Sequence, residues 1–255
     1  MVGGMWLKED NIKRAIKASL SIVLLAVILV IVIIIIMKYN VEGEKNMPFK
    51  LSKITIISTA EGIEDSQNDK DVKWKLNVLQ NNDLYFTILK NENYDKEDII
   101  ESVKIENIKI VTKPEIGEIK AYMPNSSDGR IYQYKDEYII TDKLEYIGSN
   151  TNNARTLEIG NQGGNVLMSF VNNGIGIYES NDDVIIKHDG SLINKLGKTK
   201  ENLNFSVSFD LVIKVSNKSY RTNINLDLPC GDIIQEGTST YEITDTDRFI
   251  FKREN

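Results

Sequence analysis

Only one histidine, His188, and one cysteine, Cys230, stand in the 255 residues, so side chains suited to covalent or metal chemistry are scarce. Together they are too few for a Cys/His zinc site, and a lone cysteine forms no disulfide within the chain. A Cys/His dyad would use just these two groups and an orienting residue. Cys230, however, follows an expected strand ending in LDLP, where we expect a small buried hydrophobe. The sequence therefore predicts no catalytic residue, metal or cofactor.

Acidic side chains are more abundant, and some have the spacing of calcium ligands. Asp65, Gln67, Asp69 and Asp71 stand at alternate positions in EDSQNDKD, but the central glycine and the closing glutamate of a calcium loop are missing. Two more acidic pairs, in ESNDD and TDTD, are Asp182 with Asp183 and Asp245 with Asp247. Solvated turns are the expected structure for all three clusters.

Three tyrosines form the one aromatic group with a functional interpretation. In RIYQYKDEYII, Tyr132 and Tyr134 share the parity of a strand face, and Tyr138 follows after an expected turn. An exposed aromatic face on a β-sandwich can stack on sugar rings. The alternative is an aromatic cluster packed within the sheet. Tyr132, Tyr134 and Tyr138 are thus the candidate ligand-binding residues.

The charge balance limits the partners. With 31 Lys and Arg against 37 Asp and Glu, the net charge is −6 and the isoelectric point is near 5.1. Such a chain has no strong electrostatic attraction to nucleic acid. We therefore expect no nucleic-acid partner.

Residues 18–37, ASLSIVLLAVILVIVIIIIM, form an uninterrupted apolar run without charge, Pro or Gly. At about 1.5 Å of rise per residue, a helix of this length spans roughly 30 Å, the thickness of the bilayer hydrocarbon. No small-residue cleavage signature follows the run, so it is expected to be an uncleaved signal anchor. The bilayer is therefore a predicted partner of residues 18–37.

The orientation of this helix is predicted from its basic flank. Lys13, Arg14 and Lys17 precede the apolar run closely, which favours a cytoplasmic tail over residues 1–17. A linker over residues 38–48 and an extracytoplasmic domain over residues 49–255 then follow.

The domain after the linker alternates apolar and polar residues in the manner of strands. The clearest case is Leu203 to Val215, followed by Tyr220 to Leu228, which together predict a long antiparallel hairpin. Turns are expected at Asn81 to Asp83, at Asp128 and Gly129, at the glycines of IGNQGG, and at the Asn173 and Gly174 pair. Short helical turns are expected at Asp95 to Ser102 and at Ser191 to Leu196.

Ten to twelve strands with frequent turns predict an all-β fold, an antiparallel, jelly-roll-like β-sandwich behind one transmembrane helix. The polar stretch over residues 149–153 could divide the domain into two smaller sandwiches. Neither half repeats the other, which favours a single sandwich.

The segments RTLEIGNQGGNVLMSFVNNGIGIYESNDDVIIKHDGSLINKLG and NFSVSFDLVIKVSNKSYRTNINLDLPCG resemble uncharacterised single-pass membrane proteins of clostridia and related gut Firmicutes. The resemblance covers about the last hundred residues and the arrangement of anchor and β domain. It implies a bacterial cell-membrane protein with its domain outside the cell, and it assigns no functional residue.

The leading functional hypothesis is a non-enzymatic binding or structural component of the cell envelope, with a protein or glycan partner at the cell surface. A carbohydrate-binding module using the three tyrosines is one alternative. A glycoside-type hydrolase built on scattered carboxylates is another.

Overall fold

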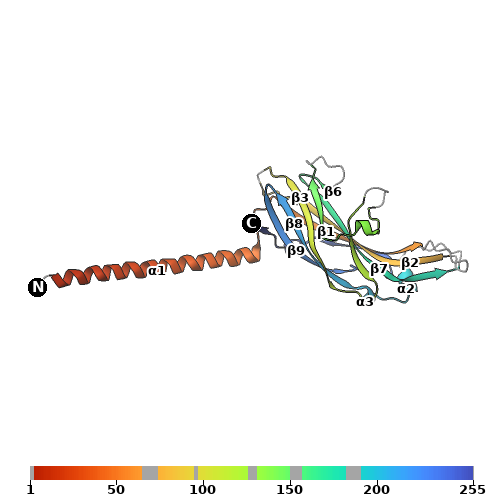
Figure 1. Ribbon diagram of the computed structural model, residues 1–255, viewed down its shortest axis with the longest axis horizontal. Helices are drawn as coiled ribbons and strands as arrows, with labels where there is room; N and C mark the ends of the chain where they lie inside the picture. The colour runs from red at the N-terminus through yellow and green to blue at the C-terminus, as the bar shows by residue number, and fades with distance from the viewer. Residues whose placement is uncertain are drawn as a thin grey trace. The chain divides into compact units, whose positions relative to one another are not determined.

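The computed structural model describes residues 3–64, 74–94, 97–125, 131–149, 157–181 and 191–254 (Figure 1). By internal contacts, the chain divides into two units, Met1–Lys45 and Asn46–Asn255.

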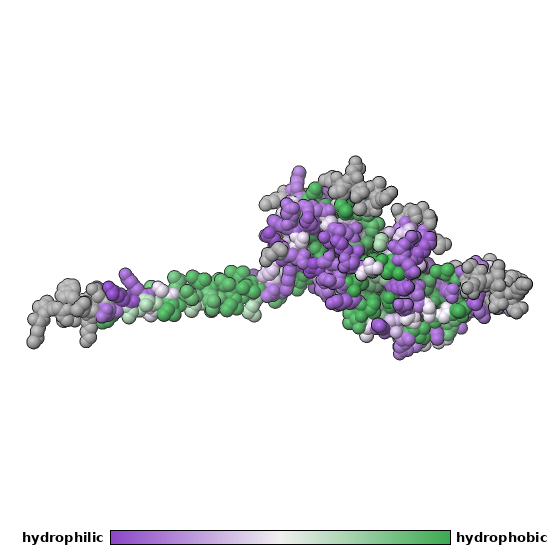
Figure 2. Space-filling model, viewed as in Figure 1, coloured by the Kyte–Doolittle hydropathy of each residue, from purple (hydrophilic) through white to green (hydrophobic). Residues whose placement is uncertain are grey.

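The first unit is a single helix, α1 (Gly3–Glu42). It ends where Gly43 adopts a φ of 68°, a conformation that glycine adopts readily, and the Gly43 N–H donates to the Tyr39 carbonyl at 2.8 Å. Asn11–Glu42 is long and apolar enough to cross a membrane, and Figure 2 shows an apolar surface along the middle part of this helix. This span contains the predicted residues 18–37. Residues 38–42 of the expected linker are helical.

The second unit contains two β-sheets. Its first sheet has the strand order β10 (Thr238–Ile243), β1 (Phe49–Glu64), β2 (Trp74–Lys90), β7 (Gly163–Ser180), β4 (Glu118–Tyr122). The second sheet has the order β11 (Lys252–Glu254), β9 (Lys218–Leu228), β8 (Phe205–Val215), β3 (Ile100–Thr112), β5 (Lys143–Gly148), β6 (Leu157–Ile159). Short helices α2 (Ser191–Lys195) and α3 (Lys200–Leu203) and the 3-10 turn η1 (Asp136–Tyr138) complete the described elements.

The two sheets enclose an apolar core, and the predicted all-β sandwich behind one apolar helix is confirmed. Phe209 of the second sheet meets Phe86 of the first edge-on, with ring centroids 5.6 Å apart, and lies 6.2 Å from Phe170. All three side chains are fully buried. The sandwich is not wholly antiparallel, because β5 and β6 pair in parallel.

The predicted hairpin is confirmed as β8 and β9, which pair from Phe205 with Leu228 to Val215 with Lys218. Its two-residue turn, Ser216 and Asn217, has positive φ angles of 47° and 62°. These are the signs that a tight hairpin turn requires. Leu203, placed in the strand by the alternation, belongs to α3 instead.

Two predicted turns are wrong. Asn81 to Asp83 lie inside the continuous strand β2, where Asn81 and Asn82 are buried. Asn173 and Gly174 lie inside β7, at an irregularity where β7 carries extra residues between the partners of Gln80 and Val78. Gly174 has a φ of 75°, so its conformational freedom serves a β-bulge rather than a hairpin turn.

Of the predicted short helices, the one at residues 191–196 is confirmed as α2, and Gly197 follows it with a φ of 65°. The prediction of a helical turn over residues 95–102 is wrong at its C-terminal end, because β3 begins at Ile100. Gly160 accepts a hydrogen bond from Gly163 in the expected glycine turn, 3.0 Å long. The expected turn at Asp128 and Gly129 and most of the 149–153 linker lie outside the described residues.

Candidate functional site

The outer face of the first sheet, the face turned away from the second sheet, is partly covered by residues 131–140. This segment runs back along the end of β4: Ile139 forms a bridge with Tyr122, and the Met123 N–H donates to the Tyr138 carbonyl at 2.9 Å. The Ile140 N–H donates to the Ala121 carbonyl, also at 2.9 Å. These hydrogen bonds fix the segment that carries the three candidate tyrosines.

The tyrosines do not form the exposed strand face expected from their spacing. Tyr132 and Tyr134 precede η1 in irregular chain, and Tyr138 is its last residue. Tyr132 is only 7% exposed and packs with Leu79 and Val171, while Tyr134 meets the Tyr122 ring edge-on at 5.4 Å. The alternation of residue types predicted a strand here. That prediction is wrong because hydrogen bonds to β4 hold the segment as an irregular loop that covers the sheet.

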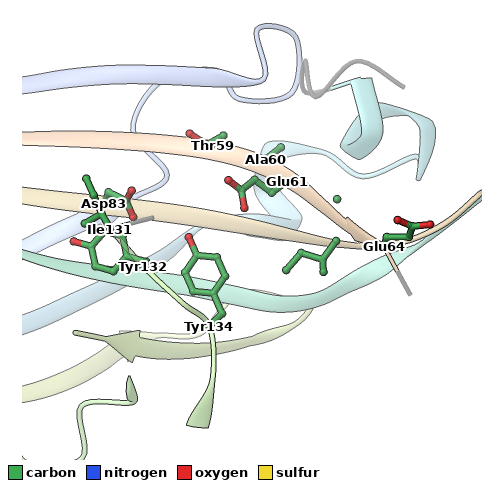
Figure 3. A pocket seen from close by; sticks show the side chains of 10 residues that line it. Thr59, Ala60, Glu61, Glu64, Asp83, Ile131, Tyr132 and Tyr134 are labelled. Carbon is green, nitrogen blue, oxygen red and sulfur yellow. The ribbon is translucent and has the colours of Figure 1, made fainter. Parts of the chain in front are cut away.

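Beside this covering segment lies a cavity of about 660 Å³, within the size range of small-molecule sites (Figure 3). Three separate parts of the chain line it: the second half of β1, one residue of β2, and the start of the covering segment. The described lining residues are Thr59, Ala60, Glu61, Gly62, Ile63, Glu64, Asp83, Ile131, Tyr132 and Tyr134. Two of the three candidate tyrosines therefore line the cavity, and Tyr138 is not among the described lining residues.

Asp83 is the electrostatically unusual group of this pocket. It lies opposite Ile57 on β1 and opposite Ser169 on β7, and burial raises the pKa of its carboxyl to about 6. The side chain of Ser169, opposite Asp83 on β7, lowers this pKa, whereas the charge of Glu61 raises it. Near neutral pH the Asp83 carboxylate is therefore mostly ionised in an environment that disfavours its charge.

Two buried oxygens of the pocket have no hydrogen-bond partner among the described residues. They are the hydroxyl oxygen of Tyr132 and Oδ1 of Asp83. Burial, and next the charge of Asp83, raise the pKa of Tyr132 far above its ordinary value, so the hydroxyl stays protonated. An unsatisfied buried polar group costs roughly 1–3 kcal/mol. Such groups are uncommon in native proteins and call for an explanation.

Near Asp83, the inner face of β1 and β2, which is turned toward the second sheet, also carries polar side chains. Ser58 donates to Oδ1 of Asn82 at 2.8 Å, and the Asn82 amide donates to the Phe170 carbonyl at 3.2 Å. Ser58 also accepts from the N–H of Cys230 at 3.1 Å. Gln80 belongs to this buried group as well. We call Ser58, Gln80 and Asn82 the polar belt.

A second polar cluster, on the outer face of the second sheet, has a structural role. Arg221 contacts Glu106 at 2.5 Å, Asp210 at 2.8 Å, and Glu254. Partial burial opposes ionisation of Asp210, but hydrogen bonds from Asn223, Asn107 and Arg221 outweigh it and hold the pKa of Asp210 below its ordinary value. Because its charges pair with one another, this network links β3, β8, β9 and β11 of the second sheet, which is a structural role.

The remaining candidates from the sequence are Cys230, His188 and the acidic clusters. Cys230 is partly buried against the core, where burial raises the pKa of its thiol, and its Sγ lies 3.6 Å from the Asp227 carbonyl. His188 and the acidic clusters at residues 65–71 and 182–183 lie outside the described residues. Among the residues that the structure describes, no three His, Cys, Asp or Glu side chains are placed to hold a metal ion.

Glu61 and Asp83 are the site residues that sequence reasoning missed. Asp83 belongs to a QNND run inside an otherwise alternating apolar segment that contains no Gly or Pro. That absence was the available signal, because an uninterrupted strand through polar residues places them in the sheet.

None of the family models, curated proteins or solved structures compared with this chain matches it.

Proposed function

We propose that this protein is a membrane-anchored, non-enzymatic binding protein, and that its β-sandwich holds a small polar ligand in the pocket beside Asp83. The observation that carries the proposal is the presence of two unpartnered buried oxygens, on Tyr132 and Asp83, in a cavity of about 660 Å³. A ligand with hydrogen-bonding groups would satisfy both.

The energetics support a functional rather than a structural interpretation of these groups. A buried carboxylate with a raised pKa and an unpaired tyrosine hydroxyl both destabilise the folded chain. Perturbed titratable groups in a pocket are typical of binding and catalytic sites. The Arg221 network contrasts with them, because each of its carboxylates has a charged or polar partner.

The anchor completes the proposal. The apolar span Asn11–Glu42 supports insertion into a bilayer, with residues 18–37 in contact with lipid. The basic residues before the run favour a cytoplasmic N-terminus, and the β-sandwich then lies outside a bacterial cell, as in the single-pass clostridial proteins that the sequence resembles. Protease added to intact spheroplasts should digest the β-sandwich, and protection of the sandwich would contradict this topology.

Ligand binding is tested with a panel of cationic, anionic and neutral small molecules, including oligosaccharides, titrated into the full chain in detergent micelles. We expect at least one member to perturb the NMR signals of pocket residues and to bind more weakly to the Tyr132→Phe variant. Tyr241→Phe is the matched control, because Tyr241 is 54% exposed on β10 and is not among the described pocket residues. Failure of every charge class to perturb the pocket would contradict the proposal.

A glycoside-type hydrolase is the second candidate, and the observation that favours it is the sharing of one pocket by Asp83 and Glu61. Most glycoside hydrolases use a pair of carboxyl groups that flank the scissile bond. Under this alternative, the chain should release reducing sugar from cell-wall glycans, and Asp83→Asn should abolish the release while leaving glycan binding intact.

A further inference from the structure

We infer that the ligand of this pocket is an organic cation, specifically a primary ammonium group on an aliphatic stem. The inference rests on the proposed function and adds the chemical class of the ligand.

The charge of the lining is the first support. Glu61, Glu64 and Asp83 line the cavity, and no Lys or Arg is among the lining residues that the structure describes. Figure 3 shows the Glu61 and Asp83 side chains projecting from neighbouring strands toward the space that Tyr134 also faces. A cation entering this space would offset the desolvation and the Glu61 charge that together raise the pKa of Asp83.

The hydrogen-bonding pattern is the second support, and it is independent of the charge. Both unpartnered groups, Oδ1 of Asp83 and the hydroxyl of Tyr132, can accept hydrogen bonds, and an ionised carboxylate can only accept. An ammonium group carries three donors and no acceptor. It therefore complements this pair better than a carboxylate or phosphate, which would bring further acceptors.

The rest of the lining suits a hydrocarbon stem. Two tyrosine rings lie with Ile63 and Ile131 on the cavity wall. Ammonium groups are attracted to the faces of aromatic rings. This chain shows that contact elsewhere, since Nζ of Lys195 lies 5.1 Å from the centre of the Tyr178 ring. A bare metal ion would use neither the rings nor the apolar wall.

The test compares two probes of matched shape, 1,5-diaminopentane and the uncharged 1,5-pentanediol, by calorimetry with the full chain in detergent micelles near neutral pH. We expect the diamine to bind at least about tenfold more tightly than the diol, as charge-assisted hydrogen bonds imply. Equal affinity for the two probes would overturn the inference. If neither binds while an anion or neutral sugar perturbs the pocket, the inference fails and the proposed function stands.

Variants locate the binding. Glu61→Gln and Asp83→Asn should each weaken diamine binding about tenfold. Glu242→Gln is the matched control, because it removes one carboxylate from β10, where Lys53 pairs with it at 2.5 Å, away from the described pocket residues. It should change the affinity less than twofold. Equal losses of affinity in all three variants would mean that the overall charge of the chain, and not the pocket, attracts the diamine. That result would overturn the inference.

Two further probes identify the source of the ammonium group. Nα-acetyl-lysine amide represents a peptide side chain, and glucosamine represents an amino sugar, with N-acetylglucosamine as its uncharged control. Preference for the lysine derivative would support a peptide ligand, and preference for glucosamine over its acetylated form would support an envelope glycan. Calcium binding at the same residues that excludes the diamine would contradict the organic-cation class.

Discussion

The three central strands of the first sheet pass through two different environments. In one half, Leu84, Phe86 and Ile88 of β2 pack against the second sheet in the main core. In the other half, Leu76 and Val78 pack in a smaller cluster with α2 and α3. The polar belt lies between them on the inner face, and the pocket occupies the outer face of that second half.

This difference shows how one sheet serves two purposes. The first half is dry, so its side chains contribute stability through burial. The second half keeps polar groups inside the sheet, and several of them have a buried atom without a hydrogen-bond partner among the described residues, at a cost in stability: Asp83 on the outer face, and also Trp74, Gln80, Asn81, Ser169 and Asn172. Binding sites commonly carry such a cost.

The largest predicted effect is in the dry half. Phe209→Ala should lower the free energy of unfolding by about 3–5 kcal/mol, because the fully buried ring contacts Phe86 and Phe170 across the sheets. Urea unfolding of the Asn46–Asn255 unit measures it. Ser208→Ala, at the neighbouring position on the outer face, should change stability by no more than about 0.5 kcal/mol. Equal effects would mean that the faces of β8 are assigned wrongly.

A substitution at Asp83 in the pocket should raise the free energy of unfolding rather than lower it. Because the pKa of Asp83 in the folded chain is about 6, against an ordinary value of 3.8, this group favours folding at low pH, and that contribution is lost as the pH rises from about 4 to about 6. Asp83→Asn should therefore raise stability above pH 7 by about 2–3 kcal/mol relative to the native chain, and this difference should vanish near pH 4. A loss of stability at pH 7 would show that Asp83 is a structural residue.

The smallest predicted effect concerns the bulge of β7. Gly174→Ala should cost about 1 kcal/mol, because the backbone φ of 75° disfavours a side chain although no atom lies within 4 Å of the added Cβ. The same urea unfolding experiment measures it. No change in stability would indicate that the bulge relaxes freely and does not help to fix the register of β2 and β7.

How much of the structure could be predicted from the sequence differs between the apolar and the polar parts of the sandwich. The hairpin of β8 and β9 was predictable because one face is buried and the other is mostly solvated, so apolar and polar residues alternate from Phe205 to Val215 with one exception, the buried Val212. Asn81 to Asp83 were mistaken for a turn, because polar residues buried in a strand have the same composition as turn residues. A single sequence does not distinguish the two.

The pocket itself was predictable only in part. Tyr132 and Tyr134 were chosen for their residue type, and both line the cavity, although on a loop and not on an exposed strand. Glu61 comes from β1, two strands of the same sheet lie between it and β4, and Tyr132 follows β4 in the chain. Their proximity depends on the strand order, which local spacing does not encode.

The most direct test of the central claim is the titration of the Asp83 carboxyl carbon by NMR in the full chain, with and without 1,5-diaminopentane. The account predicts a midpoint at about pH 6 in the free protein. It also predicts a lower midpoint with the diamine and an unchanged one with 1,5-pentanediol, because a bound cation stabilises the carboxylate. A midpoint near the ordinary value of 3.8, unmoved by the diamine, would contradict both the buried carboxylate and its role in binding.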